Sequence, residues 1–228
     1  MASRARKSKH GARQEKAGLR LGVAGAVILG ALAACCIAVV VMCTVWLQDL
    51  PDYNDASAYN YAEKTKVYAN DGTTLLAEFY LENRDPIDLD DMGAYVTKGT
   101  VATEDERFYQ HNGIDVLGIA RAVWVNVTHT GHEGASTITQ QFVRNTILAD
   151  EATESTLKRK VREAYIAIKL EESYSKDEIL QMYLNTINYG QGAYGIQAAA
   201  QRYYNKDAKD LTIAQAATLI GIPQSPTY

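Results

Sequence analysis

Apolar and polar positions divide this chain into stretches with different patterns. Residues 21–47 contain no charged side chain, and residues 48–63 are polar and rich in turn-forming residues. From about residue 64 onward, apolar residues recur at the spacings of strands and helices. The pattern therefore predicts an apolar span at 21–47, a linker at 48–63 and one folded domain at 64–228.

The apolar span is long enough to cross a bilayer. A helix rises about 1.5 Å per residue, so residues 21–47 exceed the roughly 30 Å hydrocarbon core. A signal peptide or a buried core helix would have a shorter apolar segment than this one. Residues 1–20 hold seven Lys or Arg residues and one Glu, although the whole chain has a net charge of −4. The positive-inside rule therefore places this basic tail in the cytoplasm and residues 48–228 outside.

All three cysteines, Cys35, Cys36 and Cys43, lie in the apolar span. The outer domain is thus expected to have no disulfide framework and no cysteine nucleophile. The basic tail contains no aromatic residue, and we expect no nucleic-acid partner.

The folded domain has one hairpin signal followed by helical signals. The turn sequence Asn-Asp-Gly at 70–72 is flanked by β-favouring residues, which predicts a hairpin. After about residue 87 the spacing is helical, and Ser175–Glu178 and Thr212–Gln215 have the capping-box pattern. One predicted helix carries Leu157, Val161, Ala164 and Ile168 on one face, and the next carries a buried stripe of Ile179, Leu180, Tyr183 and Leu184. The fold class is mainly α.

Three stretches carry residues suited to chemistry. In "TEDERFYQHNG" (103–113), Glu104, Phe108 and His111 would share one face of a helix. Either Thr103 and Glu106 cap a helix that starts here, or a helix that starts near residue 90 ends here. The acids are then either solvated or part of an acid/base site.

The second stretch is "GASTITQQFVRN" (134–145). Ser136, Gln140 and Arg144 align at i, i+4 and i+8, with Thr137 and Gln141 beside them. A face of hydroxyls, amides and a guanidinium is costly to bury, so it suits a polyhydroxylated or phosphorylated ligand. The alternative is a polar face turned to solvent.

The third stretch is "KRKVRE" (158–163). Arg159 and Glu163 are one helical turn apart, within a basic cluster that also includes Lys158, Lys160 and Arg162. Taken alone, this is an exposed ion pair. Together with the other two stretches, it supplies a second carboxylate and a candidate diphosphate site.

These stretches occur in order with "KDEILQMYLNTINYG" (176–190) and "YGIQAAAQRYYNK" (194–206). The five together resemble the motifs of the family 51 glycosyltransferases, which are the peptidoglycan transglycosylase domains of class A penicillin-binding proteins and their monofunctional relatives. The resemblance extends from about residue 64 to the C-terminus. It implies a lysozyme-like, two-lobed helical fold, preceded by one transmembrane helix in the cytoplasmic membrane of a bacterium.

The resemblance also implies an activity and roles for residues. The family polymerises lipid II into β-1,4-linked glycan, with inversion and release of undecaprenyl diphosphate. Glu104 would be the general base, and Glu163 would assist at the donor diphosphate, through a divalent cation such as Mg²⁺ or Mn²⁺. Arg144, which stands where the family has lysine, and Arg159 would offset the charge of the leaving group. The other expected substrate contacts are Asp105, Phe108, His111, Ser136, Thr137, Gln140, Gln141, Lys160 and Asn185.

Several alternatives stay open at this point. A lysozyme-like enzyme that cleaves glycan would also use a carboxylate in a cleft, and a scaffold would keep the fold without activity. Residues 114–133 are unusually apolar, and either part of them enters the membrane surface, with Trp124 at the headgroups, or they belong to the core. The expected partners are lipid II, the growing glycan, the membrane and other proteins of cell-wall synthesis.

Overall fold

A computed structural model describes residues 25–53, 65–79, 82–128 and 134–224. Contacts between residues divide the chain into two units, Met1–Asp49 and Leu50–Tyr228. The basic tail and most of the expected linker lie outside the described residues.

The first unit contains one long apolar helix, Gly25–Trp46. It has 22 residues and a mean hydropathy of 2.9, and none of its most apolar window is buried. Its length of about 33 Å matches the hydrocarbon thickness of a bilayer. Within the described residues it is the one helix long and apolar enough to cross a membrane, as expected for the 21–47 span.

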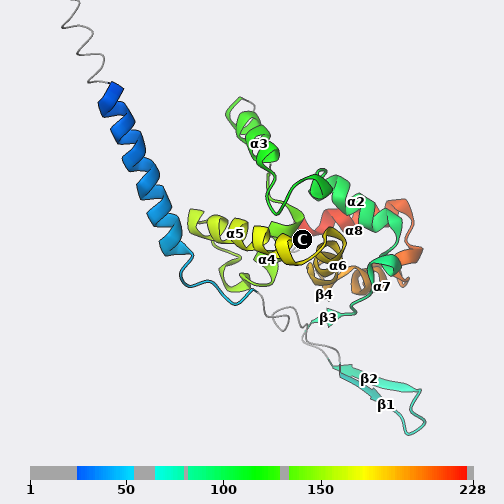
Figure 1. Cartoon of the computed structure of the whole chain (residues 1–228). Coiled ribbons are helices and arrows are strands. Elements are labelled where there is room, and N and C mark those ends of the chain that lie inside the picture. Colours follow the sequence, from blue (N-terminus) through cyan, green and yellow to red (C-terminus); the bar gives the residue numbers. More distant parts are fainter. Residues whose placement is uncertain (1–24, 54–64, 80–81, 129–133, 225–228) are drawn as a thin grey trace, which may run out of the picture. The chain divides into compact units, whose positions relative to one another are not determined.

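The second unit is mainly helical, which confirms the predicted class (Figure 1). Its helices are α2 (Ala94–Glu104), α3 (Val116–Thr128), α4 (Ile138–Asn145), α5 (Leu157–Ser173), α6 (Lys176–Thr186), α7 (Ile196–Tyr204) and α8 (Ile213–Gly221). Its strands are β1 (Thr65–Tyr68), β2 (Leu75–Phe79), β3 (Asn83–Arg84) and β4 (Ala193–Tyr194).

The predicted hairpin is present. Strands β1 and β2 pair antiparallel, with Val67 opposite Ala77. At the turn, Gly72 has a φ of 71°, a conformation that glycine adopts without strain. The Asp71 carboxylate accepts the backbone N–H groups of Thr73 and Thr74, which satisfies donors that the turn leaves unpaired. The other two strands, β3 and β4, form a short parallel pair.

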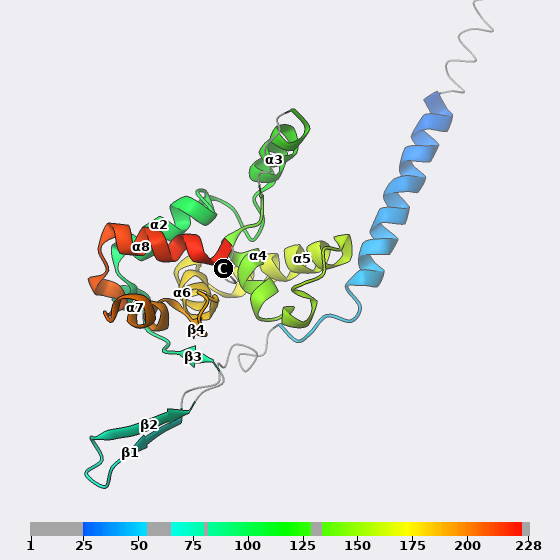
Figure 2. The ribbon, with the colours of Figure 1, turned by 180° about the vertical axis from the view of Figure 1, so that it is seen from behind.

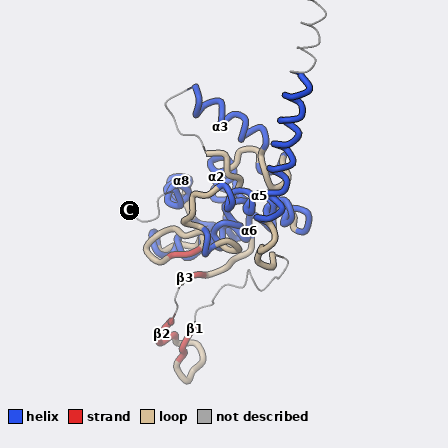
Figure 3. The backbone as a smooth tube through the Cα atoms, turned by 90° about the vertical axis from the view of Figure 1, so that its left-hand side faces the viewer, coloured by secondary structure: helices blue, strands red, loops and turns tan. Residues whose placement is uncertain are grey.

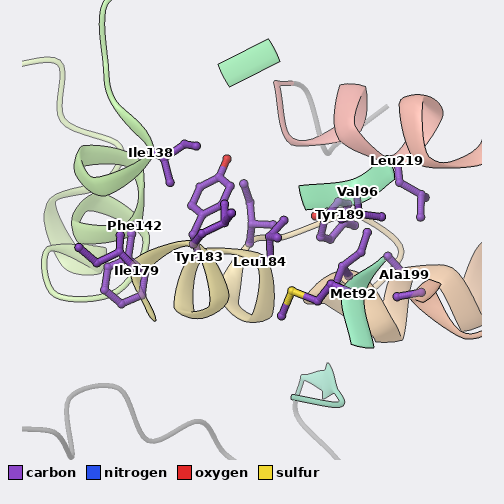
Figure 4. Close-up of a cluster of buried hydrophobic side chains, with 14 of the residues drawn as sticks. Met92, Val96, Ile138, Phe142, Ile179, Tyr183, Leu184, Tyr189, Ala199 and Leu219 are labelled. Atoms are coloured by element: carbon purple, nitrogen blue, oxygen red, sulfur yellow. The ribbon is translucent and has the colours of Figure 1, made fainter. Parts of the chain in front are cut away.

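Helix α6 lies at the centre of the packing. Helix α4 packs against α5 and α6, and α2 packs against α8 (Figures 1 and 2). Figure 4 shows side chains from these elements meeting over α6, where Phe142, Ile179 and Leu184 are completely buried. Burying each such side chain contributes roughly 1.5–3 kcal/mol, so α6 and α4 are held in a fixed relation.

The predicted buried face is confirmed for α6 and wrong for α5. The stripe of α6 is buried as predicted, and both capping boxes, at Ser175 and Thr212, are formed. The face predicted for α5 is wrong, because Leu157 is 66% exposed. Instead the buried face carries Arg159, Arg162 and Glu163, followed by Ile166 and Leu170. Charged residues occupy the inner face because each has a counter-charge there: Arg159 pairs with Glu163, and Arg162 pairs with Glu151.

Helix α3 projects from the other helices of its unit (Figures 1 and 3). Its buried residues are Gly118 and Ala122, whereas Leu117 is 69%, Trp124 67% and Val127 79% exposed. The alternative that this apolar segment belongs to the core is therefore wrong for α3. An exposed apolar patch of this kind marks a site of interaction.

Gly113 provides a test of this packing. Its φ is 80°, and a Cβ there would lie 2.6 Å from the backbone nitrogen of Ile168 in α5. We predict that Gly113→Ala lowers the free energy of unfolding by at least about 2 kcal/mol, because it combines backbone strain with a clash against backbone. Thermal denaturation followed by circular dichroism measures the loss. The control Gly221→Ala meets open space and should be neutral.

Candidate active site

A cleft of about 410 Å³ opens at the C-terminal end of α2. Glu104 and Arg107 line it from the α2 side, Arg121 from α3, and Ser136 and Gln141 from the start of α4. The cleft thus combines an amide, hydroxyls and two guanidinium groups with four carboxylates, those of Glu104, Asp105, Glu106 and Asp115. The first and second sequence stretches meet here, as the sequence predicts.

Glu104 is the last residue of α2 and is half-buried. Its Oε2 accepts a hydrogen bond of 2.8 Å from Gln141 Nε2. Its Oε1 is buried and has no hydrogen-bond partner among the described residues. One oxygen is therefore held by Gln141, and the other makes no hydrogen bond to a described residue.

Helix α2 ends here because Asp105 leaves the helical conformation, with a φ of −159°. Its carboxylate contacts His111 Nε2 at 2.9 Å and accepts the backbone N–H of Ile138, the first residue of α4, at 3.1 Å. A helix therefore ends at this stretch and does not start here. The prediction that Glu104, Phe108 and His111 share a helix face is wrong, since only Glu104 lies in the helix.

Several expected substrate contacts have structural roles. Phe108 is 0% exposed and packs in the core, so its predicted place in the substrate site is corrected. Asp105 and His111 are buried against each other, with side chains 4% and 8% exposed. They are placed to position α2 against α4. The amide of Asn185 binds the backbone N–H and carbonyl of Ile87, so it holds that segment on α6.

The start of α4 uses two more of the expected contacts. Thr137 is the N-cap, and its hydroxyl accepts the Gln140 N–H while Gln140 Oε1 accepts the Thr137 N–H. The Thr137 hydroxyl also donates to the Gly113 carbonyl at 2.7 Å. The predicted face of Ser136, Gln140 and Arg144 is therefore wrong, because Gln140 is buried in a capping box.

The polar side chains of Gln141 and Arg144 on α4 are half-buried. Both line a second hollow of about 330 Å³, together with Arg84, Asn145 and Tyr194. The side chain of Arg144 makes no hydrogen bond or ion pair with another described residue. Gln141 borders both hollows, so Glu104 and Arg144 lie on either side of it.

Two buried tyrosines, Tyr183 and Tyr189, lie within the field of Glu104. Burial raises the pKa of Tyr183, and the negative charge of Glu104 raises it further. Burial and the same charge also raise the pKa of Tyr189. The Tyr183 hydroxyl donates to Gln141 Oε1 at 3.0 Å. The sequence assigned Tyr183 only to the core stripe, because helical spacing reveals burial and gives no sign of the hydroxyl's partner.

The third stretch forms a buried charged cluster on α5. Glu163 is 0% exposed, and its carboxylate pairs with Arg159 and with Lys160, whose Nζ lies 3.0 Å from Oε2. Lys160 Nζ also donates to Ser136 Oγ at 2.9 Å. The cluster therefore reaches the cleft through Lys160 and Ser136.

The surroundings of Glu163 do not fit a metal ligand. Its two oxygens face a guanidinium and an ammonium group, so a divalent cation would meet two positive charges. Within the part of the chain that the structure describes, no three His, Cys, Asp or Glu side chains are grouped to hold a metal ion.

The buried cluster leads to a stability prediction. We expect Glu163→Ala to lower the free energy of unfolding by about 3–5 kcal/mol, since it leaves Arg159 buried without its counter-charge. Chemical denaturation with urea measures the difference. The control is Lys158→Ala on the exposed side of α5, which should change stability by less than about 0.5 kcal/mol. A small loss for Glu163→Ala would mean that water reaches Arg159.

Comparison with known proteins identifies the family of this chain. The profile of the family described as Transglycosylase matches residues 71–228. Penicillin-binding protein 2D of Bacillus subtilis (strain 168) is 45% identical over 202 residues, which cover 88% of this chain and 28% of that protein.

Other similar relatives carry a related name. Penicillin-binding protein 1A of Rickettsia felis is 39% identical over 79% of this chain and 23% of its own length. Penicillin-binding protein 1A of Vibrio cholerae is 41% identical over 78% of this chain and 21% of its own length. The chain thus spans about a quarter of the length of these relatives. Because the family profile covers more than half of the chain, this protein belongs to the transglycosylase family.

Proposed function

We propose that this chain is a peptidoglycan glycosyltransferase that polymerises lipid II into β-1,4-linked glycan strands. The observation that carries the proposal is the carboxylate of Glu104, which lines the cleft with one oxygen fixed by Gln141 and the other unpaired. Membership of the transglycosylase family and the names of the relatives support it. The lipid II substrate and the undecaprenyl diphosphate product are part of the proposal.

In the proposed reaction Glu104 is the general base. It takes the proton from the 4-hydroxyl of the acceptor sugar, and that oxygen forms a bond to the anomeric carbon of the lipid-linked donor. The bond from this carbon to the diphosphate breaks, with inversion, and its electrons leave on the diphosphate oxygen. A base that removes a proton in this way must be ionised and within hydrogen-bond reach of the hydroxyl.

The leaving diphosphate gains negative charge, which nearby cations stabilise. Arg144 is suited to this role because its guanidinium has no partner among the described residues and lines a hollow. Lys160 is suited as well, since its side chain is 41% exposed and its ammonium group already contacts Ser136 at the cleft. Arg159 is 8% exposed and paired with Glu163, so its expected role is to hold that cluster together.

A glycan-cleaving enzyme is the second candidate, and the charges disfavour it. Glycosidases place two carboxyl groups on either side of the scissile bond, about 5–9.5 Å apart. Glu163 is fully buried and paired with two cations, which does not suit a second catalytic carboxyl group. Such an enzyme also has no use for cations at a leaving diphosphate. A scaffold without activity is excluded only by an assay.

We place the protein in the cytoplasmic membrane of a bacterium, with its N-terminus inside and the second unit outside. The apolar helix Gly25–Trp46 and the basic residues before it support this orientation. The substrate would be lipid II and the growing lipid-linked glycan, and proteins of cell-wall synthesis are expected partners. A divalent cation remains a prediction for which Glu163 offers no suitable ligand.

Polymerisation of labelled lipid II in detergent tests the activity. We expect the chain to produce glycan and Glu104→Gln to lower the rate at least about 100-fold, since general-base catalysis contributes roughly 10²–10⁴-fold. Glu172→Gln is the matched control, because Glu172 is an exposed carboxylate on α5 that pairs with Lys169. Cleavage of preformed glycan, or equal rates for wild type and Glu104→Gln, would contradict the assignment.

We further propose that α3 enters the membrane surface, where a lipid-linked substrate is taken up. Its exposed apolar residues support this, with Trp124 suited to the headgroup level. With residues 1–49 removed, we predict that Trp124→Ala weakens binding to anionic liposomes severalfold in a sedimentation assay. Tyr95→Ala is the control, since Tyr95 is an exposed aromatic residue on α2. Unchanged binding of Trp124→Ala would count against the idea.

A further inference from the structure

A chain of hydrogen bonds links the core of the second unit to Glu104. The Tyr183 hydroxyl on α6 donates to Gln141 Oε1 at 3.0 Å, and Gln141 Nε2 donates to Glu104 Oε2 at 2.8 Å. Tyr183 is only 2% exposed. Figure 4 shows its ring standing on α6 with the hydroxyl oxygen at the far end, directed away from the helix.

We propose that Tyr183 is a positioning residue, which holds the Gln141 amide and through it fixes the orientation of the Glu104 carboxylate at the cleft. This inference rests on the proposed function of Glu104 as general base. Tyr183 lines neither hollow, so it acts only through Gln141 and does not contact the substrate.

The orientation of the amide matters because its two ends are different. Its nitrogen only donates hydrogen bonds and its oxygen only accepts them. If the amide turned over, Gln141 Oε1 would face the Glu104 carboxylate, and two acceptors would repel each other. The Tyr183 hydroxyl favours the productive orientation because it supplies a donor to Oε1. Without it, this oxygen would have no partner, and the carboxylate would lose its fixed orientation.

The surroundings keep the Tyr183 hydroxyl protonated, so it remains a donor. Burial raises its pKa, and the charge of Glu104 raises it further. Arg144 is the group that acts in the opposite direction. Because the balance is upward, the hydroxyl stays protonated at neutral pH and remains a donor.

The core explains the ring of Tyr183 but not its hydroxyl. Tyr183 belongs to the buried stripe of α6 together with Ile179, Leu180 and Leu184, where phenylalanine would fill the same volume. A buried hydroxyl needs a hydrogen-bond partner. If the role of Tyr183 were only structural, the bond to Gln141 would do no more than satisfy this hydroxyl. The positioning account adds that removing the hydroxyl changes the reaction more than the stability.

A double-mutant cycle separates the two accounts. We expect Tyr183→Phe to lower the polymerisation rate at saturating lipid II about tenfold, with KM changed less than about twofold, because geometry is disturbed but no substrate contact is lost. Gln141→Ala should lower the rate at least as much. The double variant should be no slower than Gln141→Ala, since Tyr183 then has no amide to hold. Rates that multiply, or a Tyr183→Phe rate equal to wild type, would overturn the proposal.

Two controls complete the experiment. Tyr203→Phe on α7 removes a hydroxyl that donates to the Tyr189 carbonyl at 2.8 Å, and it should keep the wild-type rate. Thermal denaturation should show similar stability for the Tyr183 and Tyr203 variants. Failure of the proposed function has a different signature, because then the wild type makes no glycan or Glu104→Gln remains active. Either result would also overturn the role of Tyr183.

Discussion

The site depends on one buried carboxylate, that of Asp105. It contacts His111 and accepts the backbone N–H of Ile138, so it joins the end of α2 to the start of α4. Backbone N–H groups at a helix start lack intrahelical partners, and an anion there is favoured by the helix dipole. Because Glu104 directly precedes Asp105 and Gln141 lies one turn into α4, this single contact brings the base and its amide partner together.

The buried charges of α5 provide the second constraint. Arg159, Arg162 and Glu163 occupy the inner face of that helix, and Arg162 pairs with Glu151 at 3.1 Å. Buried ion pairs contribute little net stability compared with apolar residues of the same size. We therefore attribute to these charges a role in positioning side chains. Glu163 holds Lys160 where its ammonium group contacts Ser136 at the cleft. An apolar inner face would pack as well but would leave Lys160 unrestrained.

Sequence patterns were sufficient where burial follows local spacing. The hairpin, the α6 stripe and both capping boxes of α6 and α8 depend on residues within a few positions of one another. The inner face of α5 was not predictable in this way, because its charged residues are buried only once distant partners such as Glu151 are present. Phe108 was misplaced for a similar reason, since it is buried beside a distant residue, Lys176, whose ammonium group lies 4.4 Å from the centre of its ring.

Gln140 and Gln141 show why residue type alone cannot identify a site. Both are amides in the same stretch, yet Gln140 is 6% exposed and Gln141 lines both hollows. The difference arises from the first turn of α4. Gln140 is the third helical residue, so its side chain reaches back to the N–H of Thr137 in a capping box. The cap fixes where the helix begins, and the next residue is thereby turned toward Glu104. The buried Gln140 thus determines where the side chain of its half-buried neighbour Gln141 lies.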